Sequence, residues 1–280
     1  MKIQKILNNS VALSCDENNN EIVVMGKGIA YGKQVGDSID ESLITKCFIL
    51  NTVNYSQNII HMLGNIPSIY IDITDMIMNY VQNHLNLKLH ESTYLSLIDH
   101  IHASVERFKS GVVLKNKLLW EIKHFYKKEY EVGIYVLNLL EKQLNIKMLE
   151  DEAGFIALHI VSATKDNDIN NAYKETAFIH SITNIVKYYF NIEYDYDSFD
   201  YNRFLMHLKF FSMRVFSEKV NSVQPLQNDL LNMLQEQYKN SYLCSLKIKE
   251  YIQEKYHYEL DSDEILYLTI HIAKITHDKK

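Results

Sequence analysis

The chain has 280 residues, of which 47% are hydrophobic and 23% charged, and its formal net charge is −6. This composition is typical of a folded globular protein and excludes a disordered chain. The negative net charge provides no overall basic field, so any binding of nucleic acid must depend on local groups and on shape. The length favours about two domains, with room for a small third one.

Three cysteines, Cys15, Cys47 and Cys244, are widely spaced and form no CxxC pair. This spacing argues against a disulfide framework or a zinc site and fits a reducing compartment. The opening segment has no apolar run of signal-peptide length, and no stretch of about 18 apolar residues occurs anywhere. We therefore expect a cytoplasmic protein without membrane insertion.

The first part of the chain has the pattern of short strands. Polar and glycine-rich turns separate apolar runs at Lys2–Leu7, Val11–Cys15, Glu21–Met25 and Ser42–Leu50. These runs predict a small antiparallel sheet built from hairpins. Because so small a sheet buries little apolar surface by itself, dimerisation is a reasonable way to complete its core.

From about residue 58 the apolar residues recur at helical spacing. The last glycine is Gly154, and the only proline after it is Pro225, which favours helices over hairpins in the second half. Predicted helices cover residues 71–87, 114–126, 134–144, 178–189, 226–238 and 243–256.

The helical part is internally repeated. DEAGFIALHI at residues 151–160 aligns without a gap on DEILYLTIHI at residues 263–272, so His159 corresponds to His271. The repeat predicts two tandem helical domains of about 105–110 residues each. The polar run at 166–171 lies where the boundary between them is expected.

A second pair of histidines also repeats. Tyr94 precedes His100 by six residues, as Tyr201 precedes His207, so each predicted domain has two histidines in matching places. A single histidine beside an apolar stripe is more often a packing residue than a functional one. Repetition at equivalent positions is harder to explain by packing alone.

Several chemistries remain open for these four histidines. Metal binding would favour a histidine or carboxylate three or four residues further on, which none of the four has. The chain also lacks a GxSxG nucleophile motif and a phosphate-binding P-loop. Phosphoryl acceptance needs only an accessible neutral imidazole and a docking partner, and it fits best. We expect no catalytic residues, metal or cofactor, and a protein that is not an enzyme.

Segments along the whole chain resemble a known family, the BglG/LicT transcriptional antiterminators. The opening MKIQKILNNSVALSCDENNNEIVVMGKGIAYGKQVGDSID is similar to the family's co-antiterminator RNA-binding domain. SLIDHIHASVER, LLWEIKHFYKKEY and DEAGFIALHIV resemble its first phosphotransferase-system (PTS) regulation domain, and YNRFLMHLKFF and SDEILYLTIHIAK the second. The resemblance implies a multidomain protein, with a small antiparallel β-sheet RNA-binding domain at 1–56 and two all-α helical-bundle regulation domains at 62–168 and 172–280.

The resemblance also implies a function. A homodimer binds a hairpin in an mRNA leader and prevents an overlapping terminator from forming, in response to a sugar. The sugar-specific PTS permease is expected to act on His100 and His159, and the phosphocarrier HPr on His207 and His271. Phosphorylation of the first pair is expected to inhibit the protein, and phosphorylation of the second to activate it.

The RNA contacts implied by the resemblance lie in two turns and one strand of the predicted sheet. They are Lys5, Asn8, Asn9, Ser10, Gly26, Lys27, Gly28 and Tyr31. The family often has Asn, Arg and Phe at positions 10, 27 and 31. Tyr31 keeps an aromatic ring that can stack on a base. Lys27 keeps the positive charge but lacks the planar guanidinium fork.

Two other functions stay open at this stage. Regulation domains of this type also occur in DNA-binding activators, although the strand-rich first part of this chain does not predict a helix-turn-helix. A histidine-dependent metallohydrolase is the third alternative.

Overall fold

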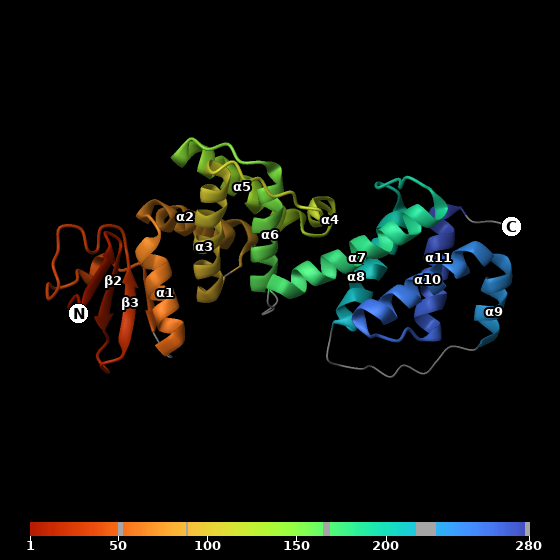
Figure 1. Ribbon diagram of the computed structural model, residues 1–280, viewed down its shortest axis with the longest axis horizontal. Coiled ribbons are helices and arrows are strands. Elements are labelled where there is room, and N and C mark those ends of the chain that lie inside the picture. The colour runs from red at the N-terminus through yellow and green to blue at the C-terminus, as the bar shows by residue number, and fades with distance from the viewer. Residues whose placement is uncertain (50–52, 88, 165–168, 217–227, 278–280) are drawn as a thin grey trace. The chain divides into compact units, whose positions relative to one another are not determined.

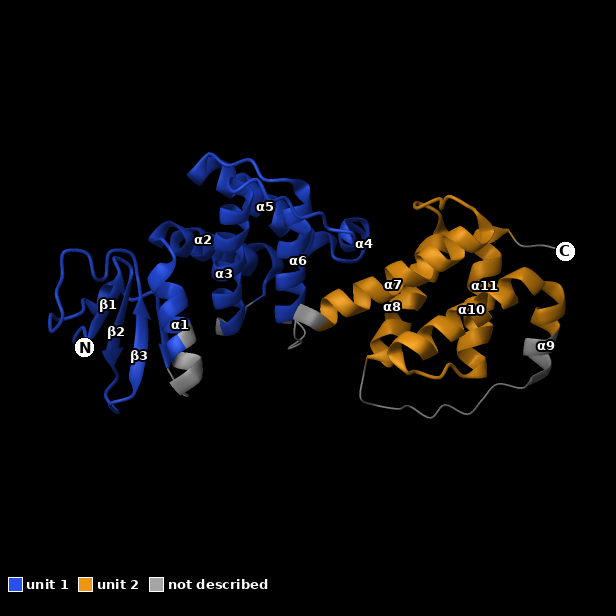
Figure 2. Ribbon diagram, viewed as in Figure 1, with its two compact units in different colours: residues 1–169 blue, residues 170–280 orange. Residues whose placement is uncertain are grey.

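The computed structural model describes residues 1–49, 53–87, 89–164, 169–216 and 228–277. It divides into two compact units, residues 1–169 and 170–280, which are described separately (Figure 2). Part of the polar run expected between the helical domains, residues 166–168, lies outside the described residues, as do Leu50 and residues 226–227 of two predicted elements.

The first unit begins with a four-stranded antiparallel sheet in the order β1-β2-β3-β4 (Figure 1). The predictions for β2, Val11–Cys15, and β3, Glu21–Met25, are confirmed. β1 is Lys5–Asn8, shorter than predicted, with Lys2 forming an isolated bridge to Ser38. The fold class expected for this part is therefore correct.

The prediction of one strand over residues 42–50 is wrong in its first part. A 3-10 turn, η1, covers Glu41–Leu43, and β4 covers only Lys46–Ile49. The side chain of Asp40 causes the difference, because its Oδ1 accepts hydrogen bonds from the backbone N–H and the hydroxyl of Ser42. Such a side-chain cap stabilises a helical turn in place of an extended strand.

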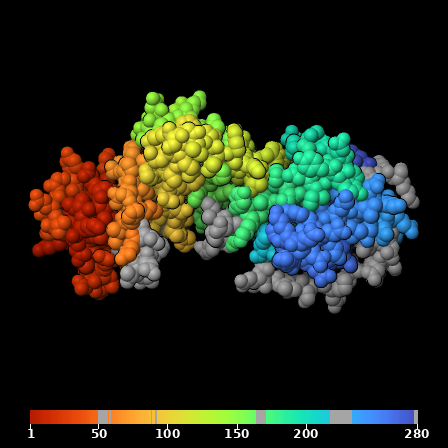
Figure 3. All heavy atoms as spheres, viewed as in Figure 1, coloured from red at the N-terminus to blue at the C-terminus, as the bar shows by residue number. Residues whose placement is uncertain are grey.

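Both faces of the sheet are covered within the chain. Successive side chains of a strand point to opposite faces, so Ala12, Ile22 and Val24 face a cluster closed by the loop after β3. The alternate residues Leu13 and Val23 face helix α1. Figure 3 shows the atoms of α1 lying directly against those of the sheet. The sheet thus completes its core with this helix in the described structure.

The helices of the first unit follow the sheet (Figure 1). They are α1 Val53–Asn65, α2 Ser68–Leu85, α3 Glu91–Lys109, α4 Leu119–Phe125, α5 Lys127–Leu144 and α6 Glu150–Thr164. The helix predicted from residue 114 begins only at 119. There the backbone N–H of Asn116 donates to Asp151 at 2.8 Å, and its side-chain oxygen accepts from the N–H of Leu118, which holds a turn before α4.

The second unit consists of helices in its described part. They are α7 Ile169–Phe190, α8 Phe199–Val215, α9 Asn228–Gln237, α10 Lys239–Tyr256 and α11 Ser262–Thr276. α5 and α10 both follow a tyrosine with similar backbone angles, Tyr126 and Tyr238, and both end in a left-handed residue. This likeness matches the sequence repeat, which pairs α6 with α11 and α3 with α8.

Several helices of the glycine-poor part end at a residue other than glycine that adopts the left-handed conformation. α2 and α5 end at Asn86 and Asn145, with φ of 53° and 55°, and α10 ends at His257 with φ of 55°. Asparagine is the residue after glycine that best tolerates this left-handed conformation. Helices can therefore stop without glycine. None of the described helices combines the length and apolarity needed to cross a membrane.

The close contact between α5 and α6 gives the first prediction. A Cβ added to Gly133 in α5 would lie 2.2 Å from the carbonyl oxygen of Ala153 in α6, whereas a Cβ on Gly64 in α1 would meet nothing within 4 Å. We expect Gly133→Ala to lower the free energy of unfolding by about 1–3 kcal/mol, because the helices must move apart. Gly64→Ala should raise it by about 0.5–1 kcal/mol through helix propensity. Equal effects of the two variants in urea denaturation would contradict this packing.

Candidate functional site

The two turns named as RNA contacts lie side by side at one end of the sheet. The N–H of Gly26 donates to the carbonyl of Ser10 at 2.9 Å, and the N–H of Ala30 donates to that of Asn9 at 3.1 Å. The β1–β2 hairpin and the turn after β3 therefore form one surface. Its exposed side chains include Asn9, Lys27 and Tyr31, the last 74% exposed.

Two of the predicted contact residues are engaged within the chain. Asn8 donates from Nδ2 to the carbonyls of Leu63 and Ile66 at the end of α1, at 2.9 and 3.2 Å. Its Oδ1 accepts the N–H of Ser10, which is only 3% exposed. The Asn8 side chain thus fastens the sheet to α1. Lys5 is exposed on β1.

The two glycines of the turn have backbone reasons for being glycine. A Cβ on Gly26 would lie 1.8 Å from the carbonyl oxygen of Leu43, and Gly28 has φ of +70°. A side chain at 26 would clash, and one at 28 would be strained. These residues shape the surface that presents Lys27 and Tyr31.

In the first unit, α3 and α6 bring His100 and His159 together. Their ring centroids are 4.5 Å apart. Nδ1 of His159 lies 3.0 Å from the hydroxyl of Ser96, one turn before His100 on α3. Oε1 of Glu152, in the first turn of α6, lies 2.7 Å from Nε2 of His100. The two histidines predicted for this domain therefore lie side by side in the structure.

In the second unit, α8 and α11 bring His207 and His271 together in the same way. Their ring centroids are 5.0 Å apart, and the ring of Tyr267 lies 5.5 Å from that of His207. Glu264, in the first turn of α11, accepts a hydrogen bond from Tyr258 at 3.1 Å and lies 3.4 Å from Nε of Arg214.

Burial lowers the pKa of three of these imidazoles, those of His159, His207 and His271. Desolvation, with the nearby His100, lowers the pKa of His159 to about 3. Desolvation, with His271 and Arg214, lowers the pKa of His207 to about 4. Burial also lowers the pKa of His271, with Arg203 and Lys274 adding to the effect. A neutral imidazole has a free lone pair, which makes it a nucleophile at pH 7.

The acidic and basic residues beside the histidines were not among the site residues predicted from the sequence. Glu152 and Glu264 belong to the repeated DE motif, and both are buried. Arg107 and Arg214 each follow a repeated histidine by seven residues, and the chain has only one other arginine. Their equal spacing was the signal that could have identified them. Among the described residues no group of three His, Cys, Asp or Glu side chains could hold a metal ion.

Comparison with known proteins agrees with this geometry. The CAT RNA binding domain profile matches residues 1–57, and the PRD domain profile matches residues 75–163 and 180–275. Over 98% of its length the chain is 40% identical to the transcription antiterminator LicT of Bacillus subtilis, of which 99% is covered. It is 38% identical over 98% of its length to the beta-glucoside operon antiterminator of Dickeya chrysanthemi, of which 96% is covered.

The chain belongs to this family of transcriptional antiterminators. A solved structure from a related protein, the crystal structure of GlcT CAT-PRDI, covers 59% of this chain and 98% of its own, with 31% identity and a TM-score of 0.51. The antiterminator family consists of RNA-binding regulators of transcription and not of enzymes. The CAT match contains the turn surface, and the two PRD matches contain the two histidine pairs.

The lowered pKa values of His159 and His207 predict how stability depends on pH. In the unfolded antiterminator these imidazoles gain a proton near pH 6.5, but in the folded one only near pH 3 and 4. Acid therefore favours unfolding, by about 1.4 kcal/mol per pH unit for each group between those values. The free energy of unfolding, measured in urea, should fall from pH 6.5 to pH 5.

A substitution tests the origin of that slope. His207→Gln should make the decline between pH 6.5 and 5 shallower, because one proton-linked group is removed. The matched control is His61→Gln, at an exposed position of α1. If both variants change the slope equally, buried His207 is not the source of the acid sensitivity.

Proposed function

We propose that this antiterminator acts as a homodimer in the cytoplasm, binds a hairpin in an mRNA leader, and prevents a terminator from forming. Residues 1–56 bind the RNA, and residues 62–168 and 172–280 are two regulation domains. The sugar phosphotransferase system controls the protein by phosphorylating histidines. The permease acts on the first domain to inhibit, and HPr acts on the second to activate.

The observation that carries this proposal is the presence of two facing histidine pairs, His100 with His159 and His207 with His271. Ring centroids 4.5 and 5.0 Å apart place each imidazole beside a second one, and among the described residues no group of three His, Cys, Asp or Glu side chains could hold a metal ion. A neutral imidazole can take a phosphoryl group from another phosphohistidine at little cost in free energy. The transferred group brings close to two negative charges into a helix–helix contact.

RNA recognition rests on the turn surface of the sheet. Lys27 supplies a positive charge and Tyr31 a ring that can stack on an unpaired base, and Asn9 lies in the adjacent turn. Side chains cannot enter the deep major groove of an RNA helix, so a distorted hairpin is read by shape and by its exposed bases. This suits a chain whose net charge is negative.

A modest binding energy is enough for the switch. A ligand at about 100 times its dissociation constant stabilises the form that it binds by about 2.7 kcal/mol. That shift reverses a near-even choice between terminator and antiterminator hairpins. Phosphorylation need only decide whether two RNA-binding domains are presented together.

The RNA surface is tested with two exposed tyrosines. Tyr31→Ala should weaken binding to a leader-RNA hairpin by about 1–3 kcal/mol, because one base loses its stacking partner. The hairpin used is the tightest binder from a panel of leader RNAs in a filter-binding assay. Tyr188→Ala is the control, since Tyr188 is 78% exposed but lies in the second unit. Equal affinities of the two variants would remove Tyr31 from the interface.

The phosphorylation sites are tested with purified components. With enzyme I, HPr and radiolabelled phosphoenolpyruvate, we expect acid-labile label on the second histidine pair, and additional label on the first pair when the permease is added. The double variant His207→Ala/His271→Ala should lose the label that comes from HPr alone. A wild-type chain that takes up no label from either donor would contradict the proposed regulation.

A further inference from the structure

An arginine and a glutamate accompany each histidine pair in the same arrangement. Arg107 follows His100 on α3 by seven residues, as Arg214 follows His207 on α8. Each arginine lies against the glutamate of the repeated DE motif on the opposite helix. We propose that Arg107 and Arg214 are phosphate-positioning residues. When the neighbouring histidine is phosphorylated, each arginine leaves its glutamate, Glu152 or Glu264, and binds the phosphoryl group.

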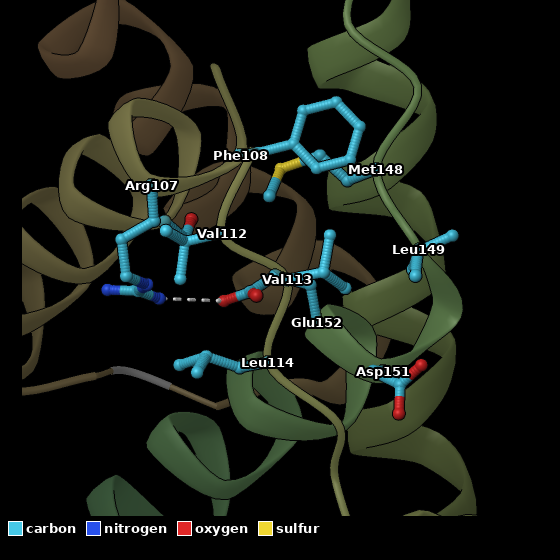
Figure 4. A pocket seen from close by; sticks show the side chains of 10 residues that line it. Arg107, Phe108, Val112, Val113, Leu114, Met148, Leu149, Asp151 and Glu152 are labelled. Carbon is cyan, nitrogen blue, oxygen red and sulfur yellow. Dashed lines mark ion pairs between the residues drawn. The ribbon is translucent and has the colours of Figure 1, made fainter. Parts of the chain in front are cut away.

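In the first site, one carboxylate oxygen of Glu152 lies near both the arginine and the histidine. Figure 4 shows Arg107 from α3 and Glu152 from α6 pointing at one another, with Nη2 of the arginine 3.8 Å from Oε1 of the glutamate. The same oxygen lies 2.7 Å from Nε2 of His100. The Glu152 side chain is 8% exposed, whereas Arg107 is 34% exposed. The arginine therefore has room to turn, and the glutamate does not.

The second site repeats the arrangement with different details. Nε of Arg214 lies 3.4 Å from Oε1 of Glu264, whose side chain is 7% exposed. Arg214 follows His207 by seven residues on α8, which places both on the same face of the helix, and its positive charge contributes to lowering the pKa of His207. Nε2 of His207 is buried and has no hydrogen-bond partner among the described residues. A phosphoryl group on this nitrogen would lie on the face of α8 that carries the guanidinium.

Charge is the reason for the exchange. A phosphoryl group carries close to two negative charges at pH 7 and would lie beside a buried carboxylate. Their repulsion in a poorly solvated contact disfavours the product unless a cation intervenes. Arginine binds phosphate oxygens through two parallel N–H groups, more strongly than it binds a single carboxylate oxygen at 3.8 Å. The guanidinium is thus expected to move from glutamate to phosphate.

This inference rests on the proposed function, in which the histidines accept a phosphoryl group. Phosphoramidate, a small phosphoryl donor, can supply that group. The lone pair of the neutral imidazole forms a bond to the phosphorus of phosphoramidate as the P–N bond of the donor breaks. The leaving nitrogen departs as ammonium, with the N–H proton that the acceptor ring gives up. The arginine forms no covalent bond in this step; it holds the oxygens of the transferred group.

The chain allows a direct test, because its only arginines are Arg107, Arg203 and Arg214. The full chain is labelled with ¹⁵N-arginine, and its Nε–H signals are assigned with single Arg→Lys variants. After phosphorylation with phosphoramidate, verified by ³¹P NMR, we expect the Arg107 and Arg214 signals to shift. In the variant His100→Ala/His159→Ala the Arg214 signal should still shift, and the Arg107 signal should stay unchanged.

The outcomes separate the two proposals. Phosphohistidine in the ³¹P spectrum with unchanged Arg107 and Arg214 signals overturns the positioning role and leaves the proposed function standing. A chain that forms no phosphohistidine with phosphoramidate or with HPr overturns both.

A rate measurement provides the second test. Arg107→Gln should slow the phosphorylation of the first histidine pair by about tenfold or more, as loss of a preorganised cation does in other phosphoryl transfers. Lys109→Gln is the matched control, because Lys109 lies on the same helix and pairs with exposed Glu106. Its rate should stay within about twofold of wild type. Equal slowing by both variants would mean that net charge, and not the position of Arg107, controls the rate.

Discussion

The structure depends on one constraint, which occurs once in each unit: two histidine rings pack against each other in a helix–helix contact. Burial lowers the pKa values of His159, His207 and His271, so each presents a lone pair and no charge near pH 7. A proton on one of these three buried rings is therefore unfavourable in the folded state. A phosphoryl group changes the contact more strongly than a proton does, because it adds both volume and charge. Burial thus has two effects: it leaves these histidines with a free lone pair, and it makes an added charge costly in the helix contact.

In the first unit, α3 connects this chemistry to the RNA-binding sheet. Tyr94 lies six residues before His100, about 9 Å along the helix. Lys46 Nζ of β4 lies 4.2 Å from the centre of the Tyr94 ring, and Phe48 stacks on it at 6.1 Å. The Tyr94 hydroxyl donates to Asp75 of α2 at 2.9 Å. A shift of α3 caused by charge at His100 would therefore act on β4 through a rigid element, which is a physical basis for coupling between the two sites.

Patterns local in sequence were predictable, and contacts between distant segments were not. Alternation identified β2 and β3. The DE-to-His repeat identified His159 and His271, and the spacing from tyrosine to histidine identified His100 and His207. The 3-10 turn at Glu41–Leu43 depends on one capping aspartate, which a run of apolar residues does not reveal. The bond from Asn8 to the end of α1 joins residues 55 and 58 positions apart, so a residue predicted to contact RNA also holds the fold. The equal spacing of Arg107 and Arg214 after a histidine could mark these arginines, but not the glutamate that each contacts on another helix.

The most direct test of the account is the RNA affinity of the full chain with phosphate on the first histidine pair alone. The variant His207→Ala/His271→Ala is phosphorylated by the permease domain, and its binding to a leader-RNA hairpin is compared with that of the same variant without phosphate. We expect phosphate on the first histidine pair to lower the affinity for the RNA hairpin on the order of tenfold, a usual size for coupling between sites. Equal affinities, with phosphate verified on the protein, would contradict the claim that charge in this imidazole contact controls the RNA-binding domain.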